Sequence, residues 1–250
     1  PVCLASPLRD VYKRQGNWWY YGRTVEGKSY GISCRVPVEG DPWTPPEVTD
    51  DMPGEQVLLD SNELAEGHEF FALGASSVST SGRFLAYSVD TEGDERFTLR
   101  IKNLDTGELL EDQLENVFYG ATWAGEDYLF YIRMDDAWRP YQVWRHHVGS
   151  TEDDVLVYQE DDERFAVGVG ADRAERYLFI AASSSLTTEY RAVPIADPTS
   201  TPQVLWPRES GVEYSVNFAE IAGQEHWVVT HNAHGPNFCV ALVPTGELPK

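Results

Sequence analysis

Apolar strand segments recur along the chain at a nearly constant spacing, and this repeat limits the folds that the sequence can adopt. Four of these segments begin near Arg83, Asp127, Arg176 and His226, so successive copies lie 44, 49 and 50 residues apart. Each segment stands between two other short strand segments, and turns rich in Gly, Ser and Asp separate them. Short strands that repeat in groups of four, about every 40 to 50 residues, are typical of a β-propeller, whose blades are four-stranded sheets.

The repeat unit is clearest in its first complete copy. We expect its first strand at 75–78 and its second at 83–88, which is mostly apolar, as in a strand that is covered on both faces. The third strand, 97–104, alternates apolar and polar residues, as in a strand with one exposed face. Fourth strands are weaker and are clearest at 155–158 and 204–205. Large aromatic residues in these strands would fill the spaces between stacked blades.

The chain before residue 75 is a partial or divergent first repeat. The elements expected there are strands at 17–21, 29–36 and 55–59, a Pro- and Gly-rich surface loop at 39–54 and one helical turn at 61–66. Either Ser61 or Asn62 would cap that turn.

These patterns predict an all-β chain that forms a partial β-propeller of about four to five four-stranded blades. A β-sandwich is the alternative, but it would not need the strand–turn–strand pattern to recur in phase. No amphipathic segments of crossover length separate the strands, so we expect no parallel sheet. The repeats stop abruptly at 244–250, which suggests a ring that is cut short.

The overall composition narrows the classes of partner. A formal net charge of −22 repels the phosphate backbone, so we expect no nucleic-acid partner. The same charge could attract cationic peptides or simply suit a saline habitat, and composition does not separate the two. No stretch approaches the roughly 18 consecutive apolar residues of a membrane span. The 3 cysteines show no disulfide framework, which fits a reducing compartment.

The first 15 residues have a different origin from the rest, in our interpretation. Residues 10–15, DVYKRQ, back-translate naturally to a transposase adapter that is used in sequencing libraries. Residues 1–9 have neither the apolar core of a signal peptide nor a strand pattern. We therefore predict that residues 1–15 are an artefact tail and that the propeller domain occupies 16–250. A genuine flexible tail is the alternative.

The residues give little sign of a chemical site. We expect no complete Gly-x-Ser-x-Gly elbow of a serine hydrolase. Gly74-Ala75-Ser76-Ser77-Val78 comes closest, but it lacks the second Gly and a following helix, so we expect a blade strand. The histidines at 226, 231 and 234 run from a strand into a turn without a nearby Cys or carboxylate, which argues against a metal site. His146 and His147 alternate on a strand, so at most one reaches any given site. Acidic pairs such as Asp153-Asp154 are expected to be solvated turn charges. No catalytic, cofactor-binding or metal-binding residue is assigned.

Several longer segments resemble one protein family. The matching runs, in order, are WWYYGRTVEGKSYGISCR (18–35), VLLDSNELAEGHEFFALGA (57–75), DERFTLRIKNLDTGE (94–108), PYQVWRHHVG (140–149), LTTEYRAV (186–193), EYSVNF (213–218) and HGPNF (234–238). They resemble the N-terminal propeller of the oligopeptidase B (protease II) branch of the prolyl oligopeptidase family of serine peptidases. The resemblance spans residues 16–243.

The resemblance implies a two-domain enzyme. A seven-bladed propeller would cap a C-terminal α/β-hydrolase domain that carries Ser, Asp and His in that chain order. The family cleaves short peptides after Arg or Lys without a cofactor. We also expect a cytoplasmic location, which agrees with the lack of a disulfide framework. The hydrolase domain and the last blades are absent from this chain, so the resemblance implies a part that is inactive alone and exposes the apolar faces of its terminal blades.

The resemblance also points to a domain interface. Glu69, Asp94, Glu95 and Arg96 fall where family members place charged groups that face the hydrolase domain. Ordinary exposed loop charges are the alternative role for these residues. A free-standing propeller that acts as a protein-binding module is the alternative function for the whole chain.

Overall fold

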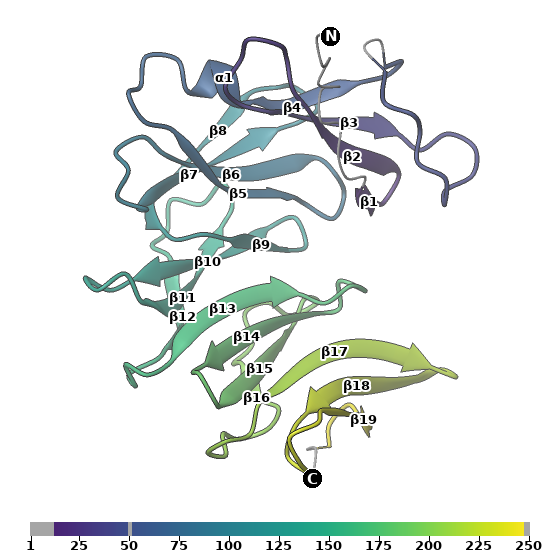
Figure 1. The fold of residues 1–250 in the computed structure, drawn as a ribbon, viewed down its shortest axis with the longest axis vertical. Coiled ribbons are helices and arrows are strands. Elements are labelled where there is room, and N and C mark those ends of the chain that lie inside the picture. Colours follow the sequence, from purple (N-terminus) through teal and green to yellow (C-terminus); the bar gives the residue numbers. More distant parts are fainter. Residues whose placement is uncertain (1–12, 50–51, 248–250) are drawn as a thin grey trace, which may run out of the picture.

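The computed structural model describes residues 13–49 and 52–247, which form five antiparallel sheets in chain order (Figure 1). We call the sheets blades 1 to 5. Blade 1 contains β1 (Lys13–Gln15), β2 (Trp18–Arg23), β3 (Ile32–Pro37) and β4 (Gln56–Asp60), and the single helical turn α1 (Ser61–Leu64) follows it. Blade 2 contains β5 (Ala72–Val78), β6 (Phe84–Asp90), β7 (Phe97–Asn103) and β8 (Leu109–Val117).

The remaining three blades follow the same strand order, and blade 5 has three described strands instead of four. Blade 3 contains β9 (Ala121–Ala124), β10 (Tyr128–Met134), β11 (Pro140–His147) and β12 (Val155–Gln159). Blade 4 contains β13 (Ala166–Ala171), β14 (Tyr177–Ser183), β15 (Thr188–Pro194) and β16 (Gln203–Val204). Blade 5 contains β17 (Tyr214–Ile221), β18 (Gln224–His231) and β19 (Cys239–Pro244). Neighbouring strands in every blade are consecutive in the sequence, so the whole structure is built from meanders.

The partial propeller predicted from the repeat is confirmed. The described strands form five separate sheets rather than two, which excludes the β-sandwich. Strand β6 is buried along nearly its whole length, and β7 alternates buried and half-buried positions, as their sequence patterns indicated. The first repeat is less divergent than expected, because β1 to β4 make a complete four-stranded sheet.

One strand was missed, and one local prediction was wrong. Leu109–Val117, which we did not assign as a strand, forms β8 and pairs with β7. The cap of α1 is Asp60 rather than Ser61 or Asn62, because the Asp60 Oδ1 atom accepts the backbone N–H of Asn62 at 2.8 Å.

The predicted adapter segment lies mostly outside the described residues. Its last three residues, Lys13–Gln15, form β1 and pair with β2. The artefact origin of residues 1–15 stays a prediction.

A buried apolar cluster fills each interface between neighbouring blades. Each cluster contains buried side chains from both blades, and examples from successive interfaces are Leu58 and Leu85, Leu99 and Tyr131, Phe130 and Ile180, and Phe179 and Trp227. A blade cannot bury both faces alone, so this stacking supplies the core that a single sheet lacks.

The two ends of the array differ. The outer face of blade 1 is covered, because Trp19 and Cys34 pack against Val48 of the loop that precedes β4. Blade 5 leaves Val240 and Leu242 at 66 % and 56 % exposure. We expected exposed apolar faces on both terminal blades. In the described structure, blade 5 has such a face and blade 1 does not. In the described part of the chain, no helix is long and apolar enough to cross a membrane.

Candidate functional site

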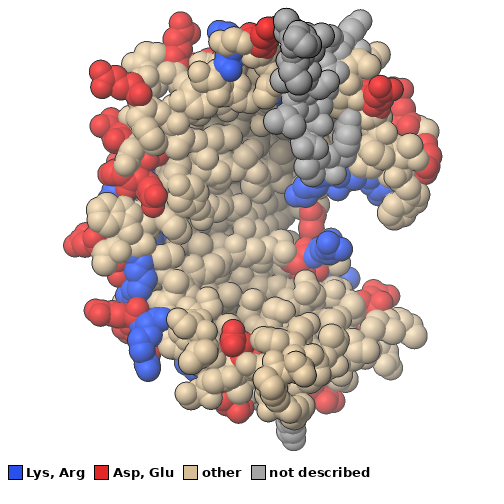
Figure 2. Space-filling view, in the orientation of Figure 1, with Lys and Arg blue, Asp and Glu red and all other residues tan. Residues whose placement is uncertain are grey.

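One side of the propeller gathers loops from all five blades. It carries the connections between blades and the loops between the second and third strands of blades 2 to 5, at the left of Figure 1. We call this side the loop face, and it comprises residues 61–71, 91–96, 118–120, 135–139, 160–165, 184–187, 205–213 and 232–238. Figure 2 shows acidic side chains along this edge, with a few basic side chains among them.

The four residues predicted at a domain interface all lie on the loop face. Glu69 is exposed in the connection between α1 and β5. Asp94 and Glu95 are exposed and Arg96 is half-buried in the loop between β6 and β7. The structure thus brings the predicted residues to one side, although they come from two separate segments.

The β6–β7 loop is held in shape by a buried carboxylate at its base. Asp90 ends β6 and accepts the backbone N–H groups of Glu92, Gly93 and Glu95 at 2.8–2.9 Å. Glu95 adopts a left-handed backbone conformation with φ of 61°. These bonds fix the direction in which the charged loop residues leave the sheet.

Neighbouring loops brace this loop from both sides. Trp138, in the β10–β11 loop, donates its indole N–H to the Asp94 carbonyl at 2.8 Å. The Arg96 guanidinium lies 5.9 Å from the centre of the Trp138 ring. On the other side, the Phe70 ring packs over Gly93. Segments from blades 1, 2 and 3 therefore form one continuous surface.

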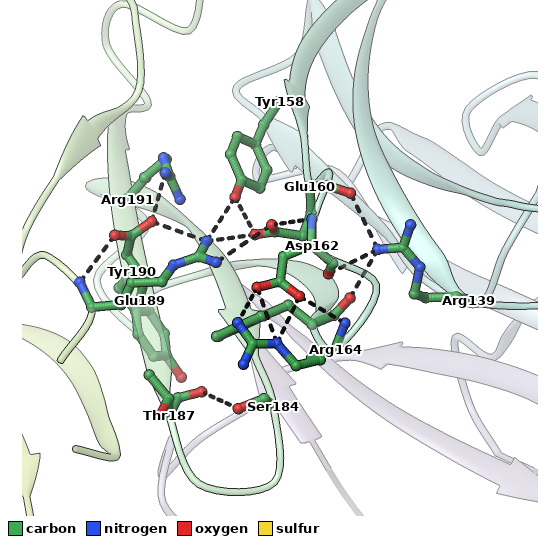
Figure 3. Close-up of polar contacts among 12 residues, drawn as sticks. Arg139, Tyr158, Glu160, Asp162, Arg164, Ser184, Thr187, Glu189, Tyr190 and Arg191 are labelled. Atoms are coloured by element: carbon green, nitrogen blue, oxygen red, sulfur yellow. Dashed lines mark hydrogen bonds and ion pairs between the residues drawn. The ribbon is translucent and has the colours of Figure 1, made fainter. Parts of the chain in front are cut away.

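A second part of the loop face is built on Arg208, in the connection between β16 and β17. Its Nη2 atom donates to Glu160 Oε2 at 2.5 Å and lies 3.4 Å from Glu189 Oε1. Tyr158 donates its hydroxyl to the same Glu160 oxygen at 2.6 Å, and Arg191 pairs with Glu189 at 2.6 Å (Figure 3). Glu160 follows blade 3 and Glu189 belongs to blade 4, so one guanidinium joins two blades to the connection that leads to a third.

Arg139 anchors the adjacent connection between β12 and β13 (Figure 3). Its Nη1 atom donates to the carbonyl oxygens of Glu160, Asp162 and Phe165 at 3.1, 3.3 and 3.1 Å. Its Nε atom donates to Asp135 Oδ2 at 2.9 Å, which holds the guanidinium in place. The guanidinium thus supplies hydrogen-bond donors to backbone carbonyls that have no partner strand in this connection.

Glu160 and Arg208 stabilise each other's charged forms. Burial would raise the pKa of the Glu160 carboxyl, but hydrogen bonds from Arg208 and Tyr158 outweigh burial and lower it. Burial and the bond to Glu160 raise the pKa of Tyr158 to about 12. The bond to Glu160 outweighs the burial of Arg208 and raises the pKa of its guanidinium.

A cavity of about 430 Å³ opens beside this network. It is lined by Arg164, Phe165, Ser184, Ser185, Leu186, Thr187, Arg208 and Ser210. Both arginines of the cavity already pair with carboxylates, Arg164 with Asp162 and Arg208 with Glu160. The cluster therefore has no spare charge with which to capture an ion, and its role in the structure is to fix the loops.

No sequence pattern pointed to this network. Arg208 stands 48 residues from Glu160 and 19 residues from Glu189, and these two carboxylates belong to different parts of the fold. Strand periodicity does not say which arginine meets Glu160 and Glu189.

The expectation that the sequence contains no complete Gly-x-Ser-x-Gly motif was wrong. Gly27-Lys28-Ser29-Tyr30-Gly31 matches Gly-x-Ser-x-Gly, but it lies in the turn between β2 and β3. An elbow places its serine between a strand and a helix, and here a strand follows. Ser29 is exposed in this hairpin turn, and Gly74–Val78 belongs to β5 as predicted.

The histidine cluster near the end of the chain differs from its prediction. His231 is buried in β18 against the Trp206 ring, rather than at a turn or edge. The Cys239 Sγ atom lies 3.4 Å from His231 Nε2, although we expected no nearby cysteine. His226 instead points its Nδ1 atom at the Gln224 carbonyl. Within the described ranges, no three His, Cys, Asp or Glu side chains are arranged to hold a metal ion.

Comparison with known proteins identifies the family of the chain. Residues 5–248 match the model described as the prolyl oligopeptidase N-terminal β-propeller domain. The chain is 38 % identical over 244 residues to dipeptidyl aminopeptidase BI of Pseudoxanthomonas mexicana. It is 32 % identical over 243 residues to protease 2 of Moraxella lacunata. Each alignment covers 94 % of this chain and 33 % of the relative.

Solved structures of oligopeptidase B resemble this chain as well. Oligopeptidase B from Leishmania major superposes with a TM-score of 0.84 at 27 % identity, over 95 % of this chain and 33 % of that chain. Oligopeptidase B from Trypanosoma brucei, in a closed form with covalently bound antipain, gives a TM-score of 0.82 at 31 % identity, over 96 % of this chain and 33 % of that one. The chain thus spans about one third of the length of these proteins.

Proposed function

The chain belongs to the prolyl oligopeptidase family, as one of its N-terminal β-propeller domains, and from this premise we propose that it is the gating propeller of a serine oligopeptidase. The complete enzyme would cleave short peptides after Arg or Lys. The propeller would restrict the active site to short, unstructured peptides, and its own residues would not take part in bond cleavage.

The loop face is the proposed contact surface for the C-terminal α/β-hydrolase domain. The observation that carries this proposal is the braced surface in which Asp94 and Arg96 meet Trp138 from the next blade. Loops fixed in this way present charged groups at defined positions, which a second domain needs for a specific interface. The Arg208 network would extend the same surface toward blade 5.

The preference for basic peptides rests on two supports. The relatives include oligopeptidase B structures, and the chain itself has a net charge of −22. Acidic surroundings concentrate cationic substrates near a gate by long-range attraction. The catalytic serine, aspartate and histidine are proposed to belong to the hydrolase domain, and no cofactor is proposed. A cytoplasmic location is also proposed, supported by the free state of Cys34 and Cys239.

The interface is tested in the complete reading frame, with hydrolysis of an Arg-amide peptide as the assay. Glu95→Lys reverses an exposed charge on the loop face, and Glu108→Lys makes the same change in the β7–β8 turn on the opposite side of the same blade. We expect Glu95→Lys to lower kcat/KM by about tenfold, the equivalent of ~1.4 kcal/mol, and Glu108→Lys to leave it unchanged. Equal effects of the two substitutions would remove the loop face as the domain contact.

The gating role is tested with the chain alone. The purified chain is expected to leave the same Arg-amide peptide intact, because the proposed catalytic residues lie in the other domain. Hydrolysis that a serine-directed inhibitor blocks would show that the chain carries its own nucleophile, and the proposal would fail.

A further inference from the structure

A buried histidine between two aspartates bridges blades 2 and 3. His146 Nε2 lies 2.7 Å from Asp112 Oδ1, and His146 Nδ1 lies 2.7 Å from Asp154 Oδ1. Asp112 belongs to β8 of blade 2, whereas His146 lies in β11 and Asp154 just before β12 of blade 3. His146 and Asp112 are 5 % and 8 % exposed, so water does not substitute freely for either partner.

The hydrogen bonds show which protonation state fits. A neutral imidazole has one N–H, and only the imidazolium can donate from both ring nitrogens to two carboxylates. The carboxylates hold further donors, since the Gly149 N–H bonds Asp112 Oδ1 and the Tyr131 hydroxyl bonds Asp154 Oδ2, each at 2.6 Å. Burial would lower the pKa of His146, but the bonds to Asp154 and Asp112 outweigh burial and raise it.

The surroundings of the bridge also favour the proton. A groove of about 710 Å³ runs along this junction, and its other charged side chains are Glu111, Glu115, Arg133, Glu152 and Asp153. Four of these five charges are negative, which stabilises a cation at His146. Arg133 opposes the proton, and its guanidinium stacks 4.6 Å from the centre of the Trp144 ring.

We propose that Asp112, His146 and Asp154 form a proton-dependent clasp that holds the outer edges of blades 2 and 3 together and opens when His146 loses its proton. A neutral imidazole would leave a ring lone pair facing one of the carboxylates, and two aspartates would then repel each other across the interface. Trp138 and Asp94 still join the two blades on the loop face, so the junction would open at one end only.

The direction of the pH effect follows from linkage. The folded pKa of His146 lies above its ordinary value of 6.5, so the stabilising contribution is complete below about pH 6.5 and is lost as the pH rises through the folded pKa. The clasp is therefore closed below about pH 6.5 and opens as the pH rises through the folded pKa of His146. This inference concerns the propeller alone and does not depend on the proposed peptidase activity.

The first measurement needs no variant. In the chain labelled with ¹⁵N-histidine, we expect both ring nitrogens of His146 to carry protons at pH 6.5 and one of them to lose its proton as the pH is raised through the folded pKa. A neutral His146 ring at pH 6.5 would overturn the proposal, because a neutral ring cannot bridge both carboxylates.

Hydrogen exchange then tests the mechanical consequence. His146→Gln removes the cation, and His147→Gln is the matched control, because His147 is the next residue and is exposed on the other face of β11. After correction for intrinsic rates, amides of residues 149–154 should exchange about tenfold faster in His146→Gln at pH 6.5, and His147→Gln should match the wild type. The wild-type protection should fall as the pH is raised above 6.5 and through the folded pKa of His146. Equal protection in both variants, or protection that does not change with pH, would show that the histidine is not a clasp.

Discussion

Removal of the Arg208 guanidinium should destabilise the propeller strongly, because it leaves a buried carboxylate without its cation. In Arg208→Met, Glu160 keeps the Tyr158 hydroxyl and the Asp162 N–H but loses the bond at 2.5 Å. Breaking a buried ion pair by removal of one partner costs about 3–5 kcal/mol. The Arg208 side chain is 27 % exposed, so solvent already screens part of the pair. We therefore expect the free energy of unfolding to fall by about 2–3 kcal/mol.

Urea unfolding followed by tryptophan fluorescence measures this loss. With a slope of about 2–3 kcal/mol per molar urea, the midpoint should fall by about 1 M. Arg164→Gln is the matched control, because Arg164 pairs with Asp162 at 2.6 Å but its side chain is 81 % exposed. Its midpoint should equal that of the wild type. Equal losses in the two variants would refute the argument from burial.

The pH dependence gives a second check on the same variant. The pKa of Glu160 is lowered in the folded protein, so the stability it contributes is present above its ordinary value and is lost as the pH falls through the lowered pKa. The difference between wild type and Arg208→Met should therefore shrink as the pH is lowered below about 4.5. A difference that stays constant on acidification would show that lost packing, not the unpaired charge, causes the destabilisation.

Two further predictions follow from burial and close packing. In a variant with the N-terminal cysteine replaced by serine, the exposed Cys239 should react with a maleimide in the native protein. Cys34 should react only after unfolding, because burial and the nearby Glu55 carboxylate raise its pKa to about 11. Labelling of both cysteines in the native protein would contradict this prediction. Gly74→Ala should lower the free energy of unfolding by about 1–3 kcal/mol, because the new Cβ would lie 2.6 Å from the Phe97 ring. Gly168→Ala, which meets nothing within 4 Å, is the control in the same urea assay, and equal midpoints would contradict the clash.

The second strand of each blade could be predicted from sequence because it is covered on both faces. Residues 84–90 are nearly all buried, so most positions of this strand carry apolar residues and the pattern is easy to recognise. Strand β8 was missed because it lies at the edge of its sheet, where only three of its nine positions are buried and acidic residues interrupt the pattern. Edge strands of a blade thus carry the weakest signal, which is why the fourth strands were the hardest to place.

Contacts between blades were beyond the reach of sequence patterns. The alternation of His146 and His147 was predicted, and the structure buries the first and exposes the second. Asp154, expected to be a solvated turn charge, is instead bonded to His146 and Tyr131, so that prediction was wrong. Strand periodicity says which face a residue takes, but it does not give the partner that the next blade brings to that face.

The clusters between blades also say how such a molecule should come apart. Each cluster contains side chains from two adjacent blades, so each blade is stabilised mainly by its immediate neighbours. The free energy of unfolding then approximates a sum of contributions from the blades and from the interfaces between them. A destabilised interface should therefore separate the blades on its two sides, and the blades within each group should stay packed together. A protease would accordingly release groups of whole blades, and the cut sites would mark the weakest junction.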